Sequence, residues 1–339
     1  MTHLYTSVEI NKIINGLDNP IVVIGNGLNI EAGVFKGGWG GILQRIAERL
    51  DSEKTVDSSE EETISSFASR MLENKDTHSV SLTELYDWIL IKYDRYRIST
   101  EQFLDTAKKS YSSKVKVNKI LQEIVEIEQR NLANRVGMSK VAKWCMAKNA
   151  DILSTNYDKC FLTLSDAISN GKIERRKDRD GKAIDTKAFP VASSYRIQDK
   201  SKKCSFNLWC INGFVDKPGS PRLSLRDYVN YANFIRREQL VFDESKDTWV
   251  RRFIDRPLVF AGISLEPQEV ILRTLLIERM RYHITNKKAF PPFSYFIQYN
   301  RRNRSEMNDV KREFLNDFGV EVLDLQKGEK LSDCFAVSN

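Results

Sequence analysis

Residues that hold metals or form disulfides are scarce in this chain of 339 residues. It has five cysteines and three histidines, and no two cysteines form a CxxC pair. The cysteines are widely spread: Cys145, Cys160, Cys204, Cys210 and Cys334. An odd, scattered set argues against a disulfide framework and against a zinc ribbon. The histidines, His3, His78 and His283, lack the spacing of metal ligands, so we expect no metal cofactor.

Long hydrophobic segments are also missing. No run approaches the roughly 18 apolar residues that a membrane-spanning helix needs. The first residues lack the basic start and the apolar run of a secretory signal. Hydrophobic residues make up 41% of the chain and charged residues 29%, which is ordinary for a globular protein. We therefore expect a soluble, cytoplasmic protein that does not bind membranes.

The net charge of +7 comes mainly from one part of the chain. Segment 171–204 holds eleven Lys and Arg residues against five Asp and Glu residues. A surface that binds nucleic acid would carry its positive charge more broadly, so nucleic acid is not favoured as a partner. We interpret 171–204 as a basic excursion from the main fold, by default a solvated loop.

The sequence contains six short apolar runs, rich in β-branched residues, and all but the last end in Gly, Asn, Ser or Asp. They lie at 20–27, 150–158, 206–213, 256–264, 293–300 and 319–325. Continuous apolar runs are typical of strands buried on both faces of a parallel sheet. Helical patterns lie between several of them. The alternation predicts an α/β fold, a Rossmann-like doubly wound parallel sheet of about six strands.

Residues 51–148 contain no strand pattern. Ser81 and Glu84 form a capping box before an apolar helical run, and further amphipathic segments follow. This stretch is too long for a simple connection between a strand and a helix. We therefore predict an all-helical insertion at 51–148 in a sheet domain made of 1–50 and 149–339. Such an insertion favours a homo-oligomer.

The first candidate motif is GNGLNIEAG, from Gly25 to Gly33, between a predicted strand and a helix. Gly25 and Gly27 would allow a tight turn and bring backbone N–H groups close to a phosphate. Gly33 would let the chain pass close to a ligand or to the sheet. The spacing differs from GxGxxG, and a simple tight turn explains the motif equally well.

Two further motifs follow predicted strands. STNYD, from Ser154 to Asp158, lies where open parallel sheets bind ligands, although Asp158 alone is explained by capping the next helix. FAGISLEPQE, from Phe260, brings Gly262 and Ser264 to another strand end, before a helix that Glu269 opens. Glu269 would reach a ribose hydroxyl of adenosine or would only interact with the helix dipole.

The order of these motifs resembles the sirtuin-like family. The turn at 25–33, TNYD, the Asn–Gly at Asn212, the LSLRDY at 223–228 and the GISL at 262–265 follow one another on the expected elements. The closest resemblance is to bacterial sirtuin-like effectors of antiphage defence. It covers roughly 20–48 and 150–325, most of the chain outside the insertion.

The resemblance implies an NAD-binding sheet and hydrolysis of NAD to nicotinamide and ADP-ribose. Depletion of NAD would then stop phage production, as in abortive infection. The pyrophosphate and the nicotinamide ribose would contact Gly25, Asn26, Gly27 and Asn29. The ribose and the attacking water would contact Thr155, Asn156 and Asp158, with Asn156 at the family's catalytic asparagine. Gly262 and Ser264 would face the adenosine half.

Three departures from the family pattern change these expectations. The paired cysteines of the zinc-containing deacylases are missing, which disfavours protein deacylation. Asn29 stands where serine is usual, and it still supplies a polar group for a ribose. Asn212 replaces the histidine that acts as general base, and an amide cannot accept a proton at neutral pH. NAD hydrolysis is still chemically feasible, with Asp158 stabilising positive charge and Asn156 and Asn212 holding the water.

Two alternatives therefore stay open. Asn212 would also suit a catalytically impaired sheet that binds NAD or ADP-ribose. The chain would otherwise be a scaffold subunit that acts with a partner ATPase or a sensor. As a regulated enzyme, it would await a phage-derived trigger or a partner.

Overall fold

The computed structural model describes most of the chain, in ranges separated by gaps. These ranges are 3–35, 38–52, 62–73, 81–100, 106–130, 136–158, 160–161, 173–175, 193–198, 205–213, 223–239, 248–265, 269–286, 291–299 and 309–337.

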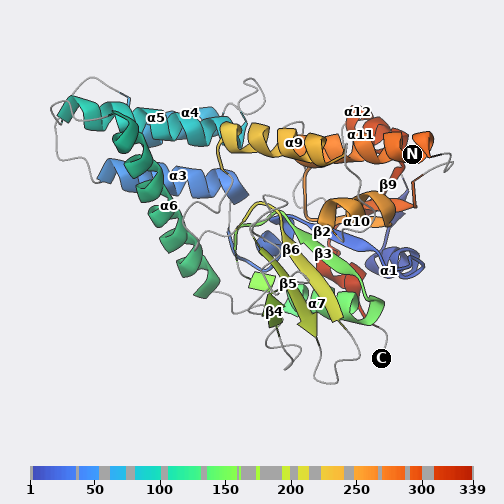
Figure 1. Cartoon of the computed structure of the whole chain (residues 1–339). Coiled ribbons are helices and arrows are strands. Elements are labelled where there is room, and N and C mark those ends of the chain that lie inside the picture. Colours follow the sequence, from blue (N-terminus) through green and yellow to red (C-terminus); the bar gives the residue numbers. More distant parts are fainter. Residues whose placement is uncertain are drawn as a thin grey trace.

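The protein has an α/β fold built on a mostly parallel sheet (Figure 1). The strand order is β1-β9-β8-β7-β2-β3-β6-β5-β4. The strands are β1 (Leu4–Tyr5), β2 (Ile21–Ile24), β3 (Asp151–Ser154), β4 (Ile173–Arg175), β5 (Ser193–Gln198), β6 (Ser205–Cys210), β7 (Leu258–Ala261), β8 (Ser294–Gln298) and β9 (Val320–Leu325). The six strands predicted from apolar runs are confirmed as β2, β3, β6, β7, β8 and β9, and all pairs among them are parallel.

The central strands are apolar because both of their faces are covered. All four residues of β2 are buried. Val22 and Ile24 belong to one hydrophobic cluster, whereas Ile21 and Val23 belong to a second cluster on the other face. Successive side chains of a strand point to opposite faces, so a continuous apolar run serves two cores at once.

Helices cover the two faces as a doubly wound fold requires. They are α1 (Ser7–Asn15), α2 (Gly27–Glu31), α3 (Gly38–Ser52), α4 (Ile64–Glu73), α5 (Leu82–Thr100), α6 (Thr106–Arg130), α7 (Val136–Lys148), α9 (Leu225–Gln239), α10 (Trp249–Asp255), α11 (Val270–Thr285), α12 (Asp309–Asp317) and the short 3₁₀ helix η2 (Leu331–Phe335). Residues of α9 to α12 line one core, and residues of α1, α7 and η2 line the other. No described helix is long and apolar enough to cross a membrane.

The sheet has more strands than the sequence indicated. Strands β4 and β5 come from the basic segment 171–204 and extend the sheet by antiparallel pairing, β5 with β6 and β4 with β5. The expectation of a solvated loop is wrong for these two stretches. Their sequences are polar, and Ile197 is a buried residue of β5, so the signal of an edge strand was weak.

Four helices, α3 to α6, pack against one another beside the carboxyl ends of the central strands (Figure 1). In contrast, α7 packs against η2, α2 and β6. The helical cluster therefore includes α3, which begins before residue 51. Helix α7, although it lies within 51–148, contacts the sheet layer.

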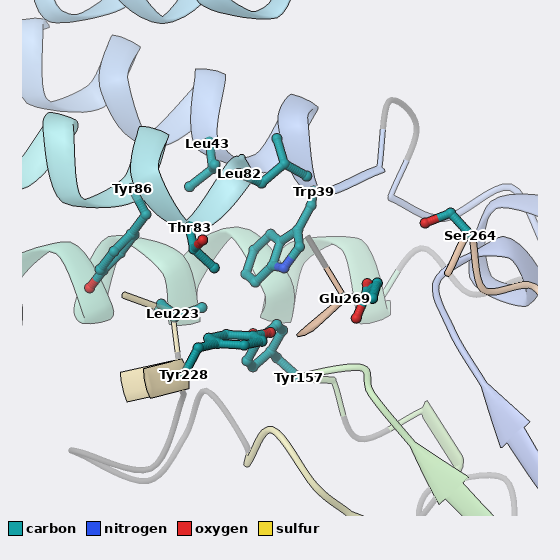
Figure 2. A pocket seen from close by; sticks show the side chains of 10 residues that line it. All are labelled: Trp39, Leu43, Leu82, Thr83, Tyr86, Tyr157, Leu223, Tyr228, Ser264 and Glu269. Carbon is teal, nitrogen blue, oxygen red and sulfur yellow. The ribbon is translucent and has the colours of Figure 1, made fainter. Parts of the chain in front are cut away.

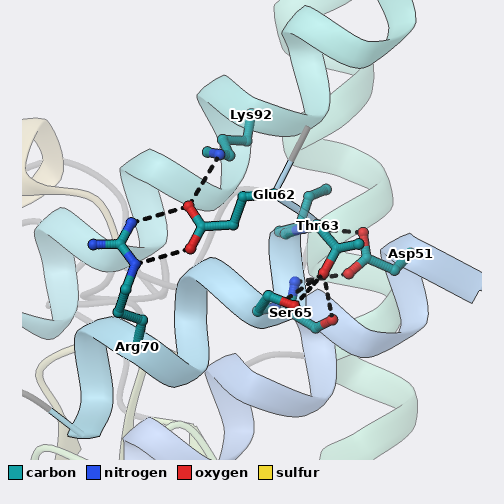
Figure 3. A network of polar contacts seen from close by, with 8 residues as sticks. Asp51, Glu62, Thr63, Ser65, Arg70 and Lys92 are labelled. Carbon is teal, nitrogen blue, oxygen red and sulfur yellow. Dashed lines mark hydrogen bonds and ion pairs between the residues drawn. The ribbon is translucent and has the colours of Figure 1, made fainter. Parts of the chain in front are cut away.

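Polar contacts fix the ends of these helices. The Asp51 carboxylate at the end of α3 accepts hydrogen bonds from the backbone N–H groups of Ile64 and Ser65, at 3.1 and 2.7 Å, and so caps α4 (Figure 3). The predicted capping box is confirmed, because Ser81 N donates to Glu84 Oε2 at 2.7 Å and Glu84 N donates to Ser81 Oγ at 3.2 Å.

The same helices are tied to the rest of the protein. Glu128 of α6 accepts from Arg45 of α3 at 2.6 Å and from the backbone N–H of Phe35 at 3.0 Å. The N-terminus of α9 is held as well, because Leu225 N donates to Asp87 of α5 at 2.9 Å. The insertion is therefore anchored to the segments that follow β2 and β6.

A buried ion cluster lies at the amino end of β3. The Asp151 carboxylate accepts from Arg252, from Arg256 at 3.1 Å and from the side-chain amide of Asn207 at 2.7 Å. Its side chain is 2% exposed, and that of Arg252 is 13% exposed. Two cations thus compensate this carboxylate and join β3 to α10 and the residue after it, while Asn207 joins β3 to β6.

Asp151→Ala should lower the free energy of unfolding by about 3–5 kcal/mol, because two arginines would lose a buried partner. Urea unfolding measures this change. Glu278→Ala, which removes the half-buried partner of the exposed Arg281, is the control and should change stability by about 1 kcal/mol or less. Equal losses of stability in the two variants would contradict a structural role for the ion cluster around Asp151.

Candidate functional site

The turns after four neighbouring strands meet at one edge of the sheet. Strands β2, β3, β6 and β7 are parallel and in register, with Ile24 opposite Ser154 and Ala261, and Ser154 opposite Cys210. The predicted site residues follow these strand ends, apart from Glu269, which directly precedes α11. The sheet therefore gathers motifs that lie up to about 240 residues apart in the sequence.

The switch point of the doubly wound fold lies between β2 and β7. There the chain leaves β2 toward β3 on one side and leaves β7 toward β8 on the other. In open α/β sheets, ligands bind in the crevice outside such a point.

Three glycines allow the turns after β2 and β7 to touch. A Cβ atom on Gly25 would lie 2.6 Å from the Gly262 carbonyl oxygen, and one on Gly27 would lie 2.5 Å from Gly262 Cα. Gly262 has a φ of +67°. Gly27 N donates to the Gly262 carbonyl at 2.7 Å. These glycines bring the backbone of the Gly262 turn close, and the Gly27 N–H has its acceptor there.

Gly33 has a different role from Gly25 and Gly27. Its φ is +84°, and no heavy atom lies within 4 Å of where a Cβ would be. Its left-handed conformation favours glycine there, and close contact with the described part of the sheet does not require it.

A chain of buried polar side chains begins in the same turn. Asn29 is fully buried, and its side-chain nitrogen donates to Asn26 Oδ1 at 3.0 Å and to Asp158 Oδ2 at 2.7 Å. The other oxygen of Asp158 accepts from Cys160 N at 2.8 Å, which is the helix-capping contact considered for Asp158. The Asn29 side-chain oxygen is buried and has no hydrogen-bond partner among the described residues.

Asn156 and Asn212 are also buried, and backbone carbonyls orient both amides. Asn156 Nδ2 donates to the Gly25 carbonyl at 3.2 Å, and Asn212 Nδ2 donates to the Thr155 carbonyl at 2.9 Å. Thr155 donates its hydroxyl to the Ile24 carbonyl at 3.1 Å. The turns after β2, β3 and β6 are therefore cross-linked through side chains predicted to contact the ligand.

A pocket adjoins this cluster, between the strand ends and the helical insertion (Figure 2). It encloses about 80 Å³ and is lined by Trp39, Leu43, Leu82, Thr83, Tyr86, Tyr157, Leu223, Tyr228, Ser264 and Glu269. Small-molecule sites usually measure about 300–1,000 Å³, so the enclosed part accommodates one group of a ligand and not a whole dinucleotide.

Aromatic side chains form the centre of the pocket. The rings of Trp39 and Tyr157 lie 4.6 Å apart at 45°, and the hydroxyls of Tyr157 and Tyr228 are 3.4 Å apart. Ser264 and Glu269 lie on the other side of Trp39 from Tyr86 (Figure 2). Trp39 thus lies between the helical cluster and the TNYD turn.

The predicted residues therefore fall into two groups. Gly25, Asn26, Gly27, Asn29, Thr155, Asn156, Asp158, Asn212 and Gly262 form the buried cluster at the strand ends. Ser264 and Glu269 line the pocket. Gly33 belongs to neither group in the contacts described. The sequence interpretation missed Leu82, Thr83 and Tyr86, which all lie at the start of α5. No local sequence pattern shows which helix faces the sheet edge.

No group of three or more His, Cys, Asp or Glu side chains is placed to hold a metal ion in the described ranges. No protein-family model matches the chain, and no curated protein matches its sequence.

Burial raises the pKa of Tyr157 well above its usual value of 10.0, and Tyr228 and Glu269 raise it further, against a smaller opposing effect of the hydrogen bond from Trp39. The neutral phenol is thus the form that the fold stabilises. This contribution is complete below the unfolded-state pKa of about 10, and it is lost as the pH rises from there toward the folded-state pKa.

Tyr157→Phe should therefore reduce the loss of stability between about pH 10 and pH 12. Denaturant unfolding at a series of pH values tests this. Some loss should persist in the variant, because burial also raises the pKa of Tyr86. If the free energy of unfolding fell with pH as steeply in the variant as in the wild-type protein, ionisation of Tyr157 would not destabilise the fold.

Gly27→Ala should lower the free energy of unfolding by about 3 kcal/mol, because its methyl group would overlap the backbone of Gly262. Gly33→Ala is the matched comparison and should cost about 1–2 kcal/mol, from its left-handed backbone alone. Urea denaturation of both variants measures the difference. A larger cost at Gly33 would contradict the close contact between the turns.

Proposed function

We propose that this chain is a sirtuin-like NAD⁺ glycohydrolase, which cleaves NAD⁺ to nicotinamide and ADP-ribose. The observation that carries the proposal is the environment of Asp158. This carboxylate is 9% exposed, lies beside the switch point, and accepts hydrogen bonds from two neutral donors. No cation within the described ranges forms an ion pair with it.

A buried carboxylate without a counter-charge is costly, so it suits a ligand that brings positive charge. The nicotinamide ribosyl group of NAD⁺ is such a ligand. The unpartnered oxygen of Asn29 next to Asp158 would accept a hydrogen bond from a ribose hydroxyl. These two features together favour a cationic, hydroxyl-bearing group at the ends of β2 and β3.

The proposed reaction breaks the bond between the nicotinamide nitrogen and ribose C1′. Nicotinamide leaves with the bonding electron pair, and its cationic ring becomes neutral without protonation. Water forms the new bond to C1′ and releases one proton to solvent. Positive charge develops on the ribose during this step, and Asp158 is placed to stabilise it.

Asn156 and Asn212 would orient the attacking water. Each amide donates to a backbone carbonyl and is therefore held in one orientation. A fixed amide positions water without accepting its proton, so acceleration would come from positioning and charge stabilisation.

The remaining ligand contacts are proposed at the pocket. Ser264 and Glu269 would lie near the adenosine half, as the resemblance implies. We do not assign the Gly27 N–H to the pyrophosphate, because it donates to Gly262.

The resemblance also supports a cellular role within this proposal. The protein would act in the bacterial cytoplasm as an effector of antiphage defence, and loss of NAD⁺ would end the infection. The helical cluster around α3 to α6 would support a homo-oligomer, and a phage-derived trigger or a partner ATPase would control the activity.

A second candidate follows from Asn212. This side chain replaces a general base, which is typically worth about 10²–10⁴-fold in rate. The protein would then bind NAD or ADP-ribose without turnover and act as a scaffold with a partner.

Asn156→Ala should reduce release of nicotinamide by about 100-fold or more, because the water would lose a fixed amide. Incubation of purified protein with NAD⁺, followed by chromatography of nicotinamide and ADP-ribose, measures this. Asn207→Ala is the control, because Asn207 lies at the opposite end of the sheet, and it should retain activity.

Full activity in Asn156→Ala would show that the site assignment is wrong. If the wild-type protein bound ADP-ribose without cleaving NAD⁺, the binding or scaffold function would replace the proposed one. Absence of both binding and cleavage would overturn both candidates.

A further inference from the structure

Two Asn–Asp pairs lie at opposite ends of β3. Asn207 Nδ2 donates to Asp151 at the amino end, and Asn29 Nδ2 donates to Asp158 beyond the carboxyl end, both at 2.7 Å. Asp151 also pairs with two arginines. For Asp158, the described partners are the Asn29 amide and the Cys160 backbone N–H.

Among the described residues, Asn29 supplies the side-chain hydrogen bond that orients Asp158. Its nitrogen uses its two hydrogens on Asp158 and Asn26, so the amide cannot rotate without losing both contacts. The Asn29 side chain is fully buried, so bulk solvent does not screen these two bonds. The Cys160 N–H holds the other oxygen of the carboxylate.

We propose that Asn29 is a positioning residue that holds the Asp158 carboxylate aimed at the reacting ribose. This inference rests on the proposed function. Hydrogen bonds from neutral donors stabilise a carboxylate without cancelling its charge. Asn29 therefore preserves the negative charge for the substrate, whereas an arginine, as at Asp151, would neutralise it.

The first test is a double-mutant cycle on stability, which requires no NAD⁺. Asn29→Ala, Asp158→Asn and the double variant are unfolded in urea at neutral pH. A hydrogen bond to a charged group predicts that Asn29→Ala shifts the unfolding equilibrium about 10- to 100-fold more with Asp158 present than in the Asp158→Asn background. Equal shifts in the two backgrounds would overturn the proposal.

The second test measures turnover in the same four proteins. Asn29→Ala should lower kcat by about 10- to 100-fold with Asp158 present and by less than about twofold in the Asp158→Asn background. Asn207→Ala loses an equivalent hydrogen bond and should leave kcat unchanged. Asn29→Ala with wild-type kcat would overturn the positioning role while leaving the proposed function intact.

A pH profile separates positioning from general loss of structure. In Asn29→Asp, two carboxyl groups would share one proton at low pH and carry the same single negative charge as the native pair. At higher pH both would ionise and repel each other. The kcat of this variant should therefore fall as the pH rises, along a limb that the wild-type protein lacks. A profile parallel to that of the wild-type protein would contradict the proposal.

These outcomes distinguish the two claims. If the wild-type protein neither binds nor cleaves NAD⁺, the proposed function fails, and the stability cycle still decides whether Asn29 holds Asp158. If NAD⁺ is cleaved and the cycle shows no coupling, the proposed function stands and the inference about Asn29 fails.

Discussion

The position of Asn29 beside Asp158 depends on how closely the turn after β2 approaches the turn after β7. Side chains on Gly25 or Gly27 would separate these turns. The hydrogen bond from Gly27 to Gly262 then fixes their distance. Because α2 starts at this contact, Asn29 is carried to the carboxyl end of β3, where Asp158 lies. Glycine here serves contact between two parts of the protein, and the polar cluster follows from that contact.

The two ends of β3 treat buried negative charge in opposite ways. At the amino end, cations from α10 and the residue after it surround Asp151, so its charge contributes to the cohesion of the fold. At the carboxyl end, neutral donors hold Asp158 and leave its charge uncompensated within the described ranges. A single short strand thus separates a carboxylate used for stability from one suited to a ligand. The difference lies in the partners, since both side chains are buried aspartates.

Much of the sheet could be predicted because strands buried on both faces are continuous apolar runs in the sequence. The run from Ile21 to Ile24 has no polar residue, and the run at 258–261 is similarly apolar. The meeting of Asn156, Asp158 and Gly262 also followed from sequence, because parallel strands end at one edge. The Ser81–Glu84 capping box could also be predicted, because both of its residues lie within one helical turn and its signal is local in the sequence.

The rest depends on contacts between distant segments. Strand β5 is polar, so pairing with β6 rather than its own pattern determines its structure. The contact of Gly27 with Gly262 cannot be inferred from a glycine-rich turn, which also suits a phosphate. The wall formed by Thr83 and Tyr86 results from the packing of α5 over the sheet edge, and no periodicity encodes that placement.

Helix α3 joins two places that the sequence keeps apart. Its first turn carries Trp39, whose ring lies against Tyr157, and further along Arg45 pairs with Glu128 of α6. A helix of 15 residues is about 22 Å long. Because Arg45 and Trp39 lie on the same helix, a displacement of α6 would be transmitted through α3 to the Trp39 indole at the pocket. A partner that binds the insertion would therefore be able to shift the indole ring beside the TNYD turn.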